Sequence, residues 1–182
     1  MTAFAFLFPG QGSQSVGMLD AWGDHPAVRD TLAQASAALG EDVATLIREG
    51  PAETLGLTTN TQPVMLTAGI ACYRAWLAEG GAPPAAVAGH SLGEYTALVA
   101  DGVLTLADAL PLVRFRAQAM QDAVPVGAGA MAAILGLDAE TVRAGCAEVA
   151  AGGNGVEAAN YNDPKQTVIS GSKAGVDKAC EL

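Results

Sequence analysis

Residues 85–100 read AAVAGHSLGEYTALVA and combine a small apolar run, a glycine-rich turn and a helical pattern. The run predicts a strand ending at Gly89, and the stretch from Glu94 to Val99 is typical of a helix. A G-x-S-x-G pattern at a strand-to-helix junction is the nucleophile elbow, in which a strained turn exposes the serine. The flanking glycines let neighbouring backbone come close. The same residues also fit an S-x-x-E capping box, so from this stretch alone Ser91 is either a nucleophile or a helix cap.

The composition is that of a globular protein. The chain has 182 residues, of which 51% are hydrophobic and 15% charged, which suits one domain or slightly more. The opening residues 1–10 lack the basic flank of a signal peptide and are interpreted as a first strand. Residues 64–77 are interrupted by Arg74 and are too short for a membrane helix. We therefore predict a cytoplasmic protein with no membrane partner.

Charge and cysteine usage exclude several classes of site. The net charge is −10 and the nine lysines and arginines are scattered singly, which argues against nucleic acid as a partner. Cys72, Cys146 and Cys180 are odd in number and contain no C-x-x-C pair, so neither a disulfide framework nor a zinc site is predicted. We expect no bound metal and no bound cofactor.

The order of apolar segments and helix breakers predicts alternating strands and helices. Strands are expected near the start and at residues 85–89, and helices at residues 26–39, 43–49, 62–78 and 105–123, besides the helix after Ser91. Alternation of this kind implies an α/β fold with a parallel sheet covered by helices.

A change of character at residues 124–129 predicts a second unit, so that the first covers residues 1–124 and the second residues 125–182. The second unit is expected to have strands at 130–137, 156–160 and 167–170, a helix at 138–150 and a helix from 173 onward. This β-α-β-β-α order is one strand short of a ferredoxin-like unit. Residues 160–164, NYNDP, come at the exit of a strand, where their amides either line a cleft or simply form a turn.

If Ser91 is a nucleophile, a base must accept its proton. The elbow would point His90 away from the serine hydroxyl, and His25 lies far upstream at a helix start, so neither is expected to be the base. A hydrolase triad requires a histidine after the nucleophile. None follows Ser91 in this sequence.

The sequence does offer candidate hydrogen-bond donors for the oxyanion that forms when the serine attacks. One donor in elbow enzymes is the backbone N–H of the next residue, here Leu92, and a second comes from a loop after another strand. The loop PGQGSQ, residues 9–14, follows the first strand, and its glycines allow backbone amides to face an anion. It departs from G-x-G-x-x-G because Ser15 replaces the third glycine, so dinucleotide binding is not expected.

Arg116 is the most informative charge. On the expected helix at 105–123 it falls on an apolar stripe. Its neighbours one turn away are Leu112, Val113, Ala119 and Met120. An inward guanidinium needs an anion, because burying it unpaired is costly and its planar fork suits a carboxylate. That anion is either an internal acid such as Glu94 or a substrate carboxylate near Ser91, whereas Arg114 is expected to be solvated.

Five segments together resemble a known family. They are FPGQGSQ at 8–14, GHSLGEY at 89–95, RFRAQAMQ at 114–121, GAMAAILGL at 129–137 and NYNDPKQTVISG at 160–171. In this order they are similar to the malonyl-CoA:acyl-carrier-protein transacylases, of the acyltransferase family of fatty-acid and polyketide synthesis. The resemblance covers nearly the whole chain and favours a nucleophile over a helix cap. It implies an α/β-hydrolase-like core with an inserted ferredoxin-like subdomain and an active site in the cleft between them.

The resemblance also implies a ping-pong reaction. Ser91 would receive malonate from malonyl-CoA and pass it to the phosphopantetheine thiol of acyl carrier protein, so these two are the expected partners and coenzyme A is part of a substrate rather than a cofactor. Matching positions assign the backbone oxyanion donors to Gln11 and Leu92, the malonyl carboxylate to Arg116, and the lining of the site to His90 and Asn162.

One departure concerns the general base. In this family it is a histidine of a later motif, which is absent here, and family members are considerably longer. We therefore interpret the sequence as an N-terminal portion, incomplete at its C-terminus, and expect the 182-residue chain alone to be inactive. The alternatives are a serine esterase or thioesterase of α/β-hydrolase type, which would pass the acyl group to water, and a fragment that only docks a carrier protein. The chain's acidity argues against the last, since carrier proteins are themselves acidic.

Overall fold

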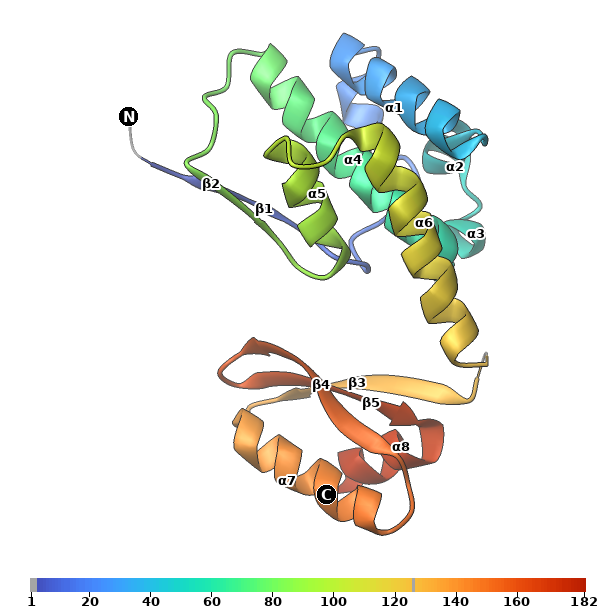
Figure 1. Cartoon of the computed structure of the whole chain (residues 1–182), viewed down its shortest axis with the longest axis vertical. Helices are drawn as coiled ribbons and strands as arrows, with labels where there is room; N and C mark the ends of the chain where they lie inside the picture. Colours follow the sequence, from blue (N-terminus) through green and yellow to red (C-terminus); the bar gives the residue numbers. More distant parts are fainter. Residues whose placement is uncertain (1–2, 126) are drawn as a thin grey trace. The chain divides into compact units, whose positions relative to one another are not determined.

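The computed structural model describes residues 3–125 and 127–182. Met1 and Thr2, from the predicted first strand, and Val126, from the predicted change of character, lie outside the described residues. The chain divides into two compact units, residues 1–121 and 122–182, and each unit has its own sheet (Figure 1).

A pair of parallel strands organises the first unit. Strand β1 (Ala5–Phe8) pairs with β2 (Ala86–Gly89), with Ala5 opposite Ala86 and Phe8 opposite Gly89. Parallel strands need a long crossover connection. Here it consists of the 3-10 helix η1 (Asp20–Trp22) and the α-helices α1 (Pro26–Leu39), α2 (Val43–Glu49), α3 (Ala52–Gly56) and α4 (Thr58–Ala78). Helices α5 (Leu92–Ala100) and α6 (Leu106–Ala123) follow β2.

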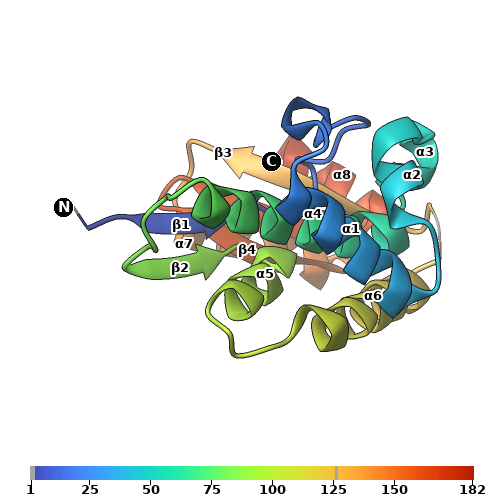
Figure 2. The same cartoon turned by 90° about the horizontal axis from the view of Figure 1, so that it is seen from above.

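Helix α4 is the centre of the first unit. It packs between α1 and α5, and α5 in turn contacts both strands (Figures 1 and 2). Its side chains Leu66 and Ile70 are fully buried with Ile47 of α2 and Leu110 of α6. Burying each such side chain stabilises the fold by about 1.5–3 kcal/mol. The predicted parallel sheet with covering helices is thus confirmed.

Aromatic side chains attach β1 to α4. Phe4, just before β1, and Phe6 and Phe8 meet Tyr73 and Trp76 of α4 edge to face, with ring centroids 5.6–6.3 Å apart. Such aromatic pairs add about 0.5–1.5 kcal/mol each beyond their buried area. They fix the end of β1, and therefore the place where the loop after Phe8 begins.

The second unit is an antiparallel sheet with two helices. Its elements are β3 (Gly129–Leu135), α7 (Ala139–Ala151), β4 (Val156–Asp163), β5 (Gln166–Ser172) and α8 (Lys173–Glu181), and the strands pair in the order β3-β5-β4. Ile169 on the central strand is fully buried with Cys146 of α7 and Val176 of α8. The predicted β-α-β-β-α order is the one observed.

Element boundaries agree with prediction where local signals decide them. Helices α1 and α2 begin and end at the predicted residues. Helix α4 begins at Thr58 instead of residue 62, and α3 was not predicted. The side chains of Asn60 and Thr61 donate to the backbone carbonyls of Thr54 and Leu55. These tertiary bonds hold the first turn of α4 against α3, and no local pattern announces them.

The structure corrects the predicted end of β4. Strand β4 continues to Asp163, so residues 160–163 are strand and not the turn that the Asn/Asp/Pro content suggested.

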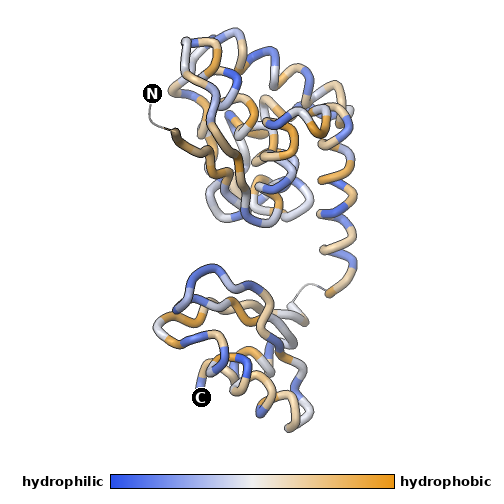
Figure 3. Tube along the Cα trace, turned by 60° about the vertical axis from the view of Figure 1, so that its left-hand side comes forward, coloured by the Kyte–Doolittle hydropathy of each residue, from blue (hydrophilic) through white to orange (hydrophobic). Residues whose placement is uncertain are grey.

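Hydrophobic and hydrophilic residues alternate along α6 (Figure 3), as in a helix with one buried face. Over residues 3–125 and 127–182, no helix is long and apolar enough to cross a membrane, and no cluster of His, Cys, Asp and Glu could hold a metal ion.

Candidate active site

Ser91 occupies a strained turn between β2 and α5. Its φ and ψ are 54° and −112°, and among the described residues it is the only one besides glycine with a positive φ. A non-glycine residue in such a region costs on the order of 1–3 kcal/mol, and these residues cluster at functional sites. The Ser91 side chain makes no capping hydrogen bond to α5. The capping-box interpretation is therefore wrong, and the elbow interpretation remains.

The two glycines of the elbow are required by close backbone contacts. A Cβ on Gly89 would lie 1.9 Å from the carbonyl oxygen of Gly93, and a Cβ on Gly93 would lie 2.3 Å from the carbonyl oxygen of Phe8. Real carbon and oxygen atoms cannot approach so closely. The turn is thus pressed both against its own helix and against the end of β1, which holds the serine in place.

Arg116 brings a cation to the serine. Its Nη2 donates to the Ser91 hydroxyl at 2.9 Å, and its Nη1 donates to Oε1 of Gln62. The guanidinium carbon lies 5.9 Å from the centre of the Tyr95 ring, within cation–π range. These partners are a hydroxyl, an amide and an aromatic ring. Glu94, the alternative partner suggested by the sequence, is exposed and forms no ion pair with Arg116 among the described residues.

The predicted position of Arg116 within an apolar stripe needs correction. The buried residues of α6 are Leu106, Ala109, Leu110, Val113 and Ala117. Leu112 and Met120, which the prediction placed inside, are 44% and 50% exposed. The buried stripe passes beside Arg116, which is half-buried at its edge. The guanidinium is therefore supported by protein on one side and accessible on the other.

Arg114 also differs from expectation. It was predicted to be solvated. Instead it forms an ion pair with Glu41, and its side chain is only 31% exposed. This pair anchors α6 to the loop between α1 and α2. Arg114 thus has a carboxylate partner, whereas no ion pair of Arg116 is found among the described residues. The two arginines consequently have different roles.

Gln62 is a residue that the sequence analysis did not select. It lies on α4, is 1% exposed, and accepts from Arg116 while its Nε2 donates to Oγ1 of Thr58 at 3.0 Å. Thr58 donates in turn to Oε1 of Gln11 at 2.9 Å. The only available signal was a glutamine at the head of the apolar run from Pro63 onward.

The loop after β1 comes to the elbow, as predicted for an oxyanion site. A Cβ on Gly10 would lie 3.1 Å from both Nδ1 and the carbonyl oxygen of His90. Gln11 follows in this exposed loop, and Leu92 is the first residue of α5. Its N–H belongs to the first turn of α5, where N–H groups lack intrahelical acceptors. The structure thus brings Gln11, His90, Ser91 and Leu92 into one region.

The remaining predicted site residue, Asn162, lies in the second unit. It is part of β4, and its Nδ2 donates to Oε1 of Gln166 at 3.2 Å across the β4–β5 hairpin. Its role in lining the site stays a prediction.

The two histidines lie in different surroundings. His25 caps α1, with Nδ1 accepting from the N–H of Ala27 at 3.2 Å and Nε2 lying 3.0 Å from Oε1 of Glu79. His90 follows β2 with its ring beside Gly10. The hydroxyl of Ser91 is bonded to Arg116. The contacts of His25 agree with the prediction that it is not the base, and for His90 this stays a prediction.

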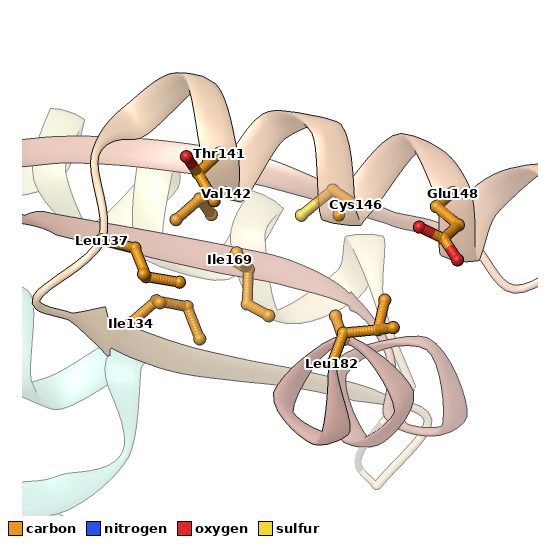
Figure 4. A pocket seen from close by; sticks show the side chains of 10 residues that line it. Ile134, Leu137, Thr141, Val142, Cys146, Glu148, Ile169 and Leu182 are labelled. Carbon is orange, nitrogen blue, oxygen red and sulfur yellow. The ribbon is translucent and has the colours of Figure 1, made fainter.

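Cys72 and Cys146 are poor competitors for the role of nucleophile. Burial raises the pKa of Cys72, and burial followed by the nearby Cys180 and Glu157 raises the pKa of Cys146. A raised pKa leaves little thiolate at neutral pH. Cys146 lines a mainly apolar pocket of about 280 Å³ between α7, the sheet and α8 (Figure 4). Few polar groups converge there, so the pocket carries no candidate chemistry.

Comparison with known proteins places these features in context. Residues 5–182 match the family described as "Acyl transferase domain". The chain is 55% identical over 180 residues to the malonyl CoA-acyl carrier protein transacylase of Escherichia coli, covering 98% of this chain and 58% of that protein.

Solved structures give the same relation. The acyl-carrier-protein S-malonyltransferase of Burkholderia pseudomallei is 68% identical with a TM-score of 0.94, and 99% of this chain covers 58% of it. A malonyl-transacylase solved in complex with a type II PKS acyl-carrier protein is 48% identical with a TM-score of 0.93, with the same coverage. The chain thus spans less than two thirds of the length of these relatives.

Proposed function

Because this chain belongs to the acyl transferase domain family, we propose that the protein transfers the malonyl group of malonyl-CoA to the phosphopantetheine thiol of acyl carrier protein. The reaction would belong to fatty-acid or polyketide synthesis. The observation that carries the proposal is the pairing of a strained, exposed Ser91 with Arg116 2.9 Å from its hydroxyl. A nucleophile beside an uncompensated cation suits an acyl group that carries its own carboxylate.

The proposed reaction has two balanced steps. Ser91 Oγ attacks the thioester carbonyl of malonyl-CoA, the carbon–sulfur bond breaks, and coenzyme A leaves with the serine proton. The phosphopantetheine thiol then attacks the malonyl ester, and the proton returns to Ser91. Positioned base catalysis contributes about 10²–10⁴-fold to such steps. Since His25 is held at the start of α1 by Ala27 and Glu79, and an elbow would point His90 away from the serine hydroxyl, we assign that role to a histidine of the later motif that the family resemblance implies.

The other sites follow from geometry and resemblance together. Backbone N–H groups of Gln11 and Leu92 would stabilise the oxyanion, because the loop after β1 and the start of α5 both adjoin the elbow. The guanidinium of Arg116 would pair with the malonyl carboxylate, for which its planar fork is suited. His90 and Asn162 would line the site.

The wider assignments are proposals of the same kind. We assign residues 1–124 to an α/β-hydrolase-like core and residues 125–182 to a ferredoxin-like subdomain, on the basis of the parallel pair and the β-α-β-β-α order. No cofactor is needed, because the thioester is the activated substrate. A cytoplasmic location accords with three free cysteines, since thiols persist in reducing compartments. A serine esterase or thioesterase would not need the cation beside Ser91.

Peptide mapping after incubation with malonyl-CoA tests this proposal. The full-length protein should carry malonate on the peptide containing Ser91, and Ser91→Ala should carry none. Label on Cys72, Cys146 or Cys180, or label that persists in the alanine variant, would refute the assignment. Incubation with acetyl-CoA, which lacks the free carboxylate of malonyl-CoA, is the matched control.

A further inference from the structure

Thr58 and Gln62 of α4 connect Arg116 to Gln11 by hydrogen bonds, but the proposed reaction gives them no role. Gln62 is 1% exposed, and a buried amide is costly unless its hydrogen-bonding groups are satisfied. Here they are satisfied, because Oε1 accepts from Arg116 while Nε2 donates to Oγ1 of Thr58 at 3.0 Å and lies 3.5 Å from Sδ of Met120. A fully satisfied buried polar residue next to a functional cation suggests a positioning role.

Arg116 decides which atom donates and which accepts in each hydrogen bond between Arg116, Gln62, Thr58 and Gln11. A guanidinium only donates, so the Gln62 atom facing it must be the oxygen. The Gln62 nitrogen therefore faces Thr58, whose oxygen must accept. The single hydroxyl proton of Thr58 is then left to donate to Oε1 of Gln11, at 2.9 Å. The four side chains form one directional relay from the cation to the loop after β1.

The relay holds the guanidinium without neutralising it. A carboxylate at position 62 would reach the same Nη1 but would pair with the charge, and a substrate carboxylate would then find a neutral ion pair. An amide fixes the orientation of Arg116 and leaves its full charge directed at Ser91, where its Nη2 already donates. Neutrality at position 62 is thus as important as the hydrogen bond.

We propose that Gln62 and Thr58 are positioning residues that set the preference for acyl groups bearing a carboxylate. Gln62 orients the guanidinium of Arg116 and keeps its charge uncompensated, and Thr58 fixes the Gln62 amide and connects it to Gln11. This inference rests on the proposed function, because it assumes that Arg116 meets the carboxylate of the acyl group.

The test compares kcat/KM for malonyl-CoA and acetyl-CoA in the full-length protein. Gln62→Glu retains an acceptor for Arg116 but adds a charge, and it should lower the malonyl-to-acetyl ratio by about tenfold or more. Thr58→Val removes the hydroxyl at nearly constant shape and should lower the ratio by about three- to tenfold. Thr58→Ser should restore it. Thr59→Val, which removes a hydroxyl one residue away and outside the relay, should keep the wild-type ratio.

The outcomes separate the inference from the proposed function. A merely structural role would lower both substrates equally, so an unchanged ratio in folded Gln62→Glu and Thr58→Val would overturn the relay while leaving malonyl transfer in place. Loss in Thr58→Val that Thr58→Ser fails to restore would also overturn it. If the wild-type protein transfers no malonyl at all, the proposed function itself fails. Thr58 is only half-buried at the start of α4, so its variants keep the test valid if Gln62→Glu does not fold.

Discussion

Removing the guanidinium of Arg116, beside Ser91, tests whether it recognises the carboxylate of the acyl group. We predict that Arg116→Ala in the full-length protein lowers malonyl transfer far more than acetyl transfer, because only malonyl carries a free carboxylate. The variant also loses the hydrogen bond from Nη2 to the Ser91 hydroxyl. That loss is common to both acyl groups, so the ratio of the two rates isolates the interaction with the carboxylate.

The magnitude follows from the burial of the guanidinium. Truncating one partner of a fully buried charge pair costs about 2–5 kcal/mol, whereas exposed pairs contribute about 0.2–1 kcal/mol. Arg116 is half-buried at the edge of the apolar stripe of α6 and rests on the buried Gln62. We therefore expect a selectivity loss near the boundary of the two ranges, about 2 kcal/mol. At about 1.4 kcal/mol per factor of ten, this is about a thirtyfold change in the ratio.

The assay follows release of coenzyme A from malonyl-CoA and from acetyl-CoA at a fixed concentration of carrier protein. Arg114→Ala is the matched control, because it removes a guanidinium from the same helix that is already paired with Glu41. It should keep the wild-type ratio. Equal losses for both substrates in Arg116→Ala would show that the guanidinium serves only as a partner for Gln62, and the reasoning would be refuted.

Two glycine-related predictions test the elbow itself. Gly93→Ala should lower the free energy of urea unfolding by about 3 kcal/mol or more, because its Cβ would lie 2.3 Å from the Phe8 carbonyl oxygen. Gly145→Ala in α7, where a Cβ meets nothing within 4 Å, should instead raise it by about 0.5–1 kcal/mol. Similar values for both variants would contradict the close packing. Ser91→Gly should raise the free energy of unfolding by about 1 kcal/mol because it relieves the positive φ, while it abolishes malonyl labelling; unchanged or lower stability would argue against strain at the elbow.

Local signals in the sequence were sufficient for much of the fold. The bounds of α1 and α2 follow from a His–Pro start and from breakers such as Gly50–Pro51, and the β-α-β-β-α order follows from periodicity. The start of α4 could not be predicted in this way, because Asn60 and Thr61 are held by bonds to α3. Strand β4 likewise extends through residues with turn propensity because β5 pairs with them.

The candidate site was predictable where chemistry is carried by a motif. Ser91 and its glycines are recognisable from spacing alone, but the spacing fits both an elbow and a helix cap, and the positive φ of Ser91 and its missing capping hydrogen bond decide between them. Arg116 was selected for a stripe that proves to pass beside it, and its proximity to Ser91 is a tertiary fact. Gln62 and Thr58 were missed, since nothing in a single sequence shows which polar residue of a helix meets a cation from another helix.

The most direct test of the central claim follows the malonyl group in a single turnover. Full-length protein is first loaded with labelled malonyl-CoA and freed of coenzyme A, and it is then mixed with holo acyl carrier protein or with buffer. We predict that the label leaves the Ser91 peptide and reaches the phosphopantetheine thiol much faster than free malonate forms in buffer. Release of free malonate at the same rate with and without the carrier protein would contradict acyl transfer and indicate a hydrolase.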